Sequence, residues 1–137
     1  MTEIADFLRA RIVERRALAE AAAEDAGLKW SPGNETFGSS VNEADSGAAV
    51  VVGPWDYLDW DVRRHIAANA PAAVIADLDA KLRILDGVVP EIDAMEDQID
   101  AEWGAGDPSE RESMTLLRIL ARPFAEHPSY RKEDWAP

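Results

Sequence analysis

Apolar residues recur every three or four positions through most of this chain, a spacing that predicts helices. The first predicted helix covers residues 3–26, with Thr2 as its N-cap and Gly27 as its terminator. The apolar side chains that lie on one face of this helix are Ile4, Phe7, Leu8, Ile12 and Leu18.

The pattern changes over residues 28–54, where turn residues separate two short runs with strand character. We expect a weak strand over 36–41, a β-branched strand over 48–52 and a turn over 42–47. A lone hairpin is marginal in water, so this one must pack on helices. Its expected packing residues are Trp30, Phe37 and Val51.

Three further helices are predicted. A short helix ends near Ala68, and a long helix follows Asn69-Ala70-Pro71. Pro90 is expected to kink or restart the long helix near Gly87. Along the second half of the long helix, the predicted apolar stripe consists of Val88, Val89, Ile92, Met95 and Ile99. The last helix begins near Asp107-Pro108, with Ser109 and Glu112 as an alternative capping box, and Pro123 ends or bends it. An irregular tail follows.

These elements predict a mainly α fold, a small bundle of three or four helices with an inserted β-hairpin; α+β is the alternative. A chain of 137 residues suits a single domain over 1–137. Its expected parts are an N-terminal helix (1–27), a hairpin region (28–54), central helices (55–104), and a C-terminal helix with its tail (105–137).

Composition narrows the function classes. The net charge of −13 disfavours direct binding to nucleic acid or anionic lipid, which depends on Lys and Arg. The chain has no cysteine, so thiolate metal sites and disulfides are excluded. No apolar run is long enough for a membrane span and no signal peptide is visible, so we expect a cytoplasmic protein.

Between Asp86 and Glu102 lie seven acidic residues and no basic one. This acidic run allows three interpretations: a carboxylate metal cluster, a mimic of duplex DNA, and the solvated face of an amphipathic helix. Four acids share one side at helical spacing, opposite the predicted apolar stripe, which favours the solvated face. These four acids are also a candidate interaction surface: Asp93, Glu96, Asp97 and Asp100.

The two histidines are the remaining candidates for chemistry. With its neighbours Trp60, Arg63 and Arg64, His65 has the residue types of a general base or of a phosphate-binding corner. General acid–base catalysis needs a partner within reach, and no carboxylate stands at a diagnostic spacing, so a packing or helix-capping role is favoured.

His127, close to Tyr130, is expected to anchor the tail. A metal pair of His65 and His127, completed by Asp59, Asp61 or Glu126, remains open, but two isolated histidines are a weak signal. We therefore expect no metal, no cofactor and no catalytic residue.

Trp55, Tyr57 and Trp60 form an aromatic cluster before the short helix. Core packing is the favoured interpretation. Exposed aromatic side chains at this place, or at Trp135, would instead indicate a partner surface, for which Trp55 and Tyr57 are candidates.

Three blocks of sequence occur in a set order. They are Asp6-Phe7-Leu8-Arg9-Ala10-Arg11-Ile12; then His65-Ile66-Ala67, Pro71-Ala72, Val74-Ile75 and Lys81-Leu82-Arg83-Ile84; then Leu117-Arg118-Ile119-Leu120-Ala121, Pro123-Phe124, His127-Pro128-Ser129-Tyr130 and Trp135. In these blocks the chain resembles an uncharacterised family of small proteins from actinobacteria and their bacteriophages, a domain of unknown function. Many members carry cysteines between the second and third blocks, where this chain has its acidic run. The resemblance implies an actinobacterial or phage origin and no known activity.

The leading hypothesis is a non-enzymatic accessory protein that acts through contacts with an unidentified protein partner and is encoded by a bacteriophage. One alternative is an acidic nucleic-acid mimic. The other is a small metal-dependent hydrolase that uses the two histidines. Self-association into a homo-oligomer stays open.

Overall fold

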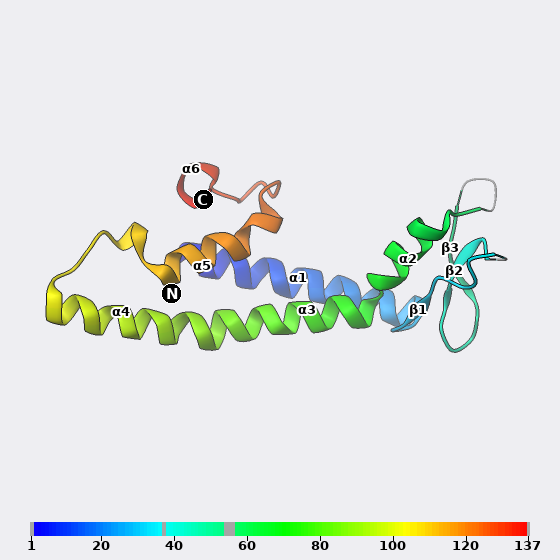
Figure 1. Ribbon diagram of the computed structural model, residues 1–137, viewed down its shortest axis with the longest axis horizontal. Helices are drawn as coiled ribbons and strands as arrows, with labels where there is room; N and C mark the ends of the chain where they lie inside the picture. Colours follow the sequence, from blue (N-terminus) through cyan, green and yellow to red (C-terminus); the bar gives the residue numbers. More distant parts are fainter. Residues whose placement is uncertain (1, 37, 54–56, 137) are drawn as a thin grey trace. The chain divides into compact units, whose positions relative to one another are not determined.

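A computed structural model describes residues 2–36, 38–53 and 57–136. It confirms the mainly α fold with a small antiparallel sheet (Figure 1). The chain divides into two compact units, one formed by Met1–Glu14 and Asp79–Pro137 and the other by Arg15–Leu78. Helices α1 (Glu3–Ala26) and α3 (Pro71–Arg83) each contribute residues to both units.

Helix α1 has the predicted limits. The backbone N–H of Ala5 donates to Oγ1 of Thr2, and the helix ends at Gly27, whose φ of 80° suits glycine. In the first unit, the apolar face of α1 is buried together with residues from the central and C-terminal helices. The buried side chains of that core are Ile4, Phe7, Leu8, Ile12, Leu85, Val89, Leu117, Ala121, Phe124 and Trp135.

Among its described residues, the second unit contains three strands, β1 (Trp30–Ser31), β2 (Ser40–Glu43) and β3 (Ala49–Val52), in the order β1-β2-β3. The predicted hairpin is therefore β2 and β3, with Val41 paired to Val51. Strand β1 was not predicted, since two residues carry no alternation to read.

The prediction that the first strand of the hairpin begins at residue 36 was wrong, because it begins at Ser40. The preceding residues form a turn instead: the N–H of Thr36 donates to Oδ1 of Asn34, and the N–H of Gly38 donates to the Asn34 carbonyl. Phe37, one of the expected packing residues, lies outside the described residues. Trp30, a second expected packing residue, donates its indole N–H to the carbonyl of Ala26 at 2.9 Å.

Helix α2 (Trp60–Ala68) is the predicted short helix, and α3 begins at Pro71 as expected. A π-helical segment, η2 (Ile84–Val88), then joins α3 to α4 (Val89–Trp103). Pro90 stands in the first turn of α4, so the predicted disturbance near Gly87 is the π segment.

The π segment overturns the predicted facing of α4. Hydrogen bonds from i to i+5 add about one residue to a turn, which rotates the following helix by about 100° relative to a continuous α-helix. Val89 stays buried, but Met95 and Ile99 are exposed, while Glu96 and Asp100 are half-buried. The expectation that Met95 and Ile99 would face the core was therefore wrong.

The C-terminal helix α5 (Glu112–Ala121) begins later than predicted. Asp107 caps only the short 3-10 helix η3 (Pro108–Glu110), by accepting from the N–H of Ser109. The capping box of Ser109 and Glu112 was a wrong prediction, because Glu112 opens α5 and its N–H donates to Glu96 of α4.

After α5, the 3-10 helix η4 (Arg122–Phe124) contains Pro123, and the tail ends in the short helix α6 (Lys132–Trp135). In the tail, Trp135 of α6 packs on Phe7 of α1. Within the described ranges, no helix is both long enough and apolar enough to cross a membrane.

Candidate functional site

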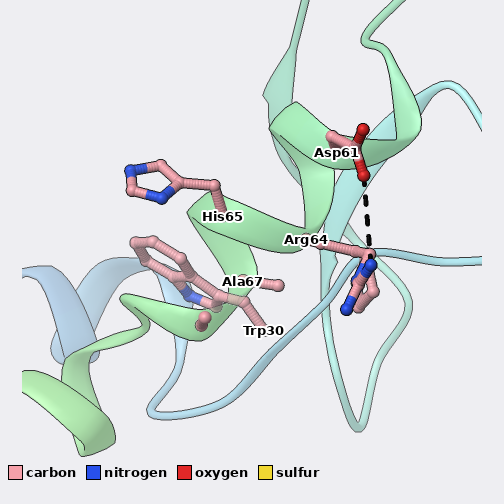
Figure 2. Close-up of a pocket in the computed structure, with 7 residues that line it drawn as sticks. Trp30, Asp61, Arg64, His65 and Ala67 are labelled. Carbon is pink, nitrogen blue, oxygen red and sulfur yellow. Dashed lines mark ion pairs between the residues drawn. The ribbon is translucent and has the colours of Figure 1, made fainter.

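The candidates around His65 lie on α2 of the second unit, beside an open hollow of about 560 Å³. Figure 2 shows the imidazole of His65 above the indole of Trp30, while Arg64 extends the other way, toward Asp61. The carboxylate of Asp61 lies 3.9 Å from the Arg64 guanidinium. In the part of the chain that the structure describes, no hydrogen bond holds the His65 ring, so it has no general acid–base partner in place.

Arg63, although adjacent in sequence, has a different environment. Its side chain is 1% exposed, and it donates to the carbonyls of Leu58 (3.1 Å), Pro32 (2.7 Å) and Asn34 (2.9 Å). The guanidinium also lies over the Trp60 ring, with 5.1 Å from its Cζ to the ring centroid. Arg63 thus holds the loop before β2 with a side chain that is buried from solvent.

Gly38 makes this arrangement possible. A Cβ atom there would collide with the Arg63 guanidinium and lie 2.5 Å from the Asn34 carbonyl oxygen. The loop therefore closes over Arg63 only with glycine at this position.

His127 belongs to an aromatic cluster in the first unit that fastens the tail to α1. Its Nδ1 accepts from the N–H of Ser129, and its Nε2 contacts the Arg11 guanidinium. Phe7 lies at the centre of the cluster, with ring centroids 5.0 Å from Trp135 and 6.1 Å from Tyr130. The Tyr130 hydroxyl donates to the Trp135 carbonyl, so this candidate functional side chain makes its hydrogen bond within the tail.

Three of the four candidate acids of α4 surround one basic residue, Arg111, just before α5, and the fourth, Asp100, is half-buried. Nη2 of Arg111 lies 2.7 Å from Oδ1 of Asp97, and the other distances are 3.5 Å to Asp93 and 3.4 Å to Glu96. Hydrogen bonding to Asp97 and the nearby charges of Asp93 and Glu96 raise the pKa of Arg111 despite the opposing effect of burial. The single positive charge of Arg111 therefore offsets part of the negative charge of this face.

Glu96 also caps α5. Its Oε1 accepts from the N–H of Glu112 at 2.5 Å, and its Oε2 accepts from the hydroxyl of buried Ser113 at 2.7 Å. Burial raises the pKa of Glu96, but these hydrogen bonds and the Arg111 charge outweigh it, so the pKa is lowered. The positive end of the α5 dipole favours the same charged form.

The rotation of α4 leaves an apolar face exposed, which we call the α4 stripe. Its members, with their exposed fractions, are Val88 (44%), the last residue of η2, and Met95 (63%), Ile99 (56%) and Trp103 (83%) of α4. Sequence reasoning placed the first three in the core and did not single out Trp103. The presence of Pro90 inside a long apolar pattern was the signal that the phase could change there.

The other aromatic candidates differ in their exposure to solvent. Tyr57 is exposed, Trp60 is half-buried beneath Arg63, and Trp55 lies outside the described residues. Among the described residues, no group of three or more His, Asp or Glu side chains could hold a metal ion.

Comparison with known proteins gives a family and no activity. No curated protein and no solved structure matches this chain. A family model described as a family of unknown function, DUF6221, matches residues 1–137. The chain therefore belongs to the DUF6221 family.

Proposed function

We propose that this protein is a non-enzymatic accessory protein that binds another protein through the α4 stripe. The observation that carries the proposal is the exposure of four large apolar side chains along one helix face, ending in a tryptophan that is 83% exposed. Contiguous apolar surface on a folded chain marks interaction sites. Tryptophan and methionine are enriched at such sites, and tryptophan is a frequent hot spot of binding energy.

We further propose that the protein is encoded by an actinobacterium or one of its bacteriophages and acts on a host protein in the bacterial cytoplasm. The support is the ordered set of three sequence blocks described above, and the phage role rests on this resemblance alone.

The rival functions draw less support. A nucleic-acid mimic would present its carboxylates freely, whereas Asp93, Glu96 and Asp97 surround Arg111. A hydrolase would place an acid–base partner beside a histidine, whereas Asp61 pairs with Arg64, and His127 contacts Arg11.

The test is capture of a partner from actinobacterial lysate at low and high salt, followed by mass spectrometry. Wild type is compared with Met95→Gln/Ile99→Gln and with a matched control, Leu18→Gln/Ile119→Gln, whose side chains are equally exposed. We expect wild type and control to retain the same protein and the stripe variant to lose it, with unchanged circular dichroism. Recovery of no specific protein at either salt would overturn the proposal.

A further inference from the structure

The α4 stripe has acidic neighbours that restrict what it can bind. We propose that the stripe docks a basic amphipathic helix of the partner protein. This inference rests on the proposed function and specifies the partner's chemistry.

The geometry of the stripe fits a helix. Its members stand at positions 88, 95, 99 and 103, the spacing of a single helix face. From first to last they span about 22 Å at ~1.5 Å per residue. A straight row of this kind packs against a second helix, whose apolar residues at i, i+3, i+4 and i+7 fill the spaces between the side chains.

The charge of the surroundings calls for a basic partner. Exposed Glu91 and Glu102 stand within one helical turn of the stripe, and no Lys or Arg occurs between Arg83 and Arg111. Arg111 itself is engaged by the acids of the opposite face. Lysine or arginine residues flanking the partner's apolar face would therefore meet unneutralised carboxylates at the rim, which accelerates association and selects the partner.

A second copy of the chain fits less well. Pairing two stripes would bring Glu91 and Glu102 of one copy against the same acids of the other, with no base on either side of the contact. Like charges across an interface disfavour association, and each copy carries a net charge of −13.

The size of the stripe sets the expected strength. A single helix face about 22 Å long, with four apolar anchors, buries less area than the ~800 Å² per partner of a standard stable interface. We therefore expect a transient contact with a dissociation constant on the order of micromolar.

The experiment uses the full chain and two synthetic 18-residue helical peptides with the same leucine face, one flanked by lysine and the other by glutamate. Binding is followed by fluorescence anisotropy of labelled peptide. The chain also carries ¹³C-methyl methionine, whose signals report Met95 on the stripe and Met114 on α5 separately. The variants are Met95→Gln/Ile99→Gln and the control Leu18→Gln/Ile119→Gln.

The lysine peptide is expected to bind wild type and control, shift the Met95 signal and spare Met114. The stripe variant should bind at least about tenfold more weakly, as the loss of hot-spot residues predicts. The glutamate peptide should bind at least about tenfold more weakly than the lysine peptide at low salt, with the difference shrinking as salt is added.

Three results would overturn the inference: equal binding of both peptides, binding that the stripe variant retains, or no binding. Sedimentation that shows a stripe-dependent dimer would identify a second copy as the occupant and would also overturn it. The proposed function is judged separately, because a lysate protein that wild type captures and the stripe variant loses would stand even if the lysine peptide failed to bind.

Discussion

Replacing Arg63 by methionine tests whether this residue organises the second unit rather than binding a ligand. Methionine keeps much of the side-chain length and apolar contact but removes every donor. The substitution leaves the carbonyls of Pro32 and Asn34 without the guanidinium that they share. The loop before β2 would then lose its attachment to α2.

The magnitude follows from the contacts. Three hydrogen bonds, at 2.7, 2.9 and 3.1 Å, contribute about 1 kcal/mol each, and the fourth, to Glu35 at 3.4 Å, is too long to add much. Stacking on Trp60 adds about 0.5–1 kcal/mol, and the cost of burying the charge offsets a similar amount. We therefore expect Arg63→Met to lower the free energy of unfolding by about 3 kcal/mol.

The assay is urea unfolding followed by circular dichroism, with hydrogen–deuterium exchange of the peptide that covers residues 32–35. Arg63→Lys is the matched control: it keeps the charge but not the planar fork, so it should lose about half as much. A change of less than about 0.5 kcal/mol in Arg63→Met, with unchanged exchange in the loop, would show that Arg63 does not hold the loop in place.

Three further predictions concern the first unit. Glu96→Ala should lower the free energy of unfolding by about 1 kcal/mol, because it removes the cap of α5. Since folding lowers the pKa of Glu96, wild type should be the more stable protein at pH values above the ordinary pKa of 4.5, and this advantage should vanish as the pH falls through the folded pKa. Equal stability of wild type and Glu96→Ala in urea at pH 7 would contradict this. Trp135→Ala should cost about 3 kcal/mol and release the tail to protease, whereas unchanged proteolysis of residues 127–136 would show that the cluster on Phe7 is not the anchor. Deletion of Gly87 should remove the extra residue of the π segment and keep the facing of α4, so peroxide should oxidise Met95 at the wild-type rate, whereas a slower rate would argue against the π segment as the cause of the facing.

Local signals predicted the fold where local interactions determine it. Helix α1 follows from its apolar spacing, its Thr2 cap and the glycine at its end, all of which lie within one helix length. The hairpin of β2 and β3 follows in the same way from β-branched residues on either side of a turn.

Long-range contacts account for what the sequence did not reveal. Arg63 donates to carbonyls 29 and 31 residues away, and backbone carbonyls are the same in every residue type, so no motif marks them. Likewise the cap of α5 comes from Glu96, 16 residues before Glu112, whereas a capping box is a local pattern.

The facing of α4 depends on the π segment, because a shift of one residue turns the helix by about 100°. Periodicity alone assumes a constant 3.6 residues per turn across Pro90. For this reason the prediction separated the acids from the apolar stripe but missed that Glu96 and Asp100 are half-buried and that Met95 and Ile99 are exposed.

The central claim is that the α4 stripe is the surface that a partner protein covers. The most direct measurement places a photo-crosslinking amino acid at position 99, in place of Ile99, and separately at position 119, in place of the equally exposed Ile119. After irradiation in host cells, we expect one discrete adduct from position 99 and none from position 119. Adducts of equal yield from both positions, or none from position 99, would contradict it.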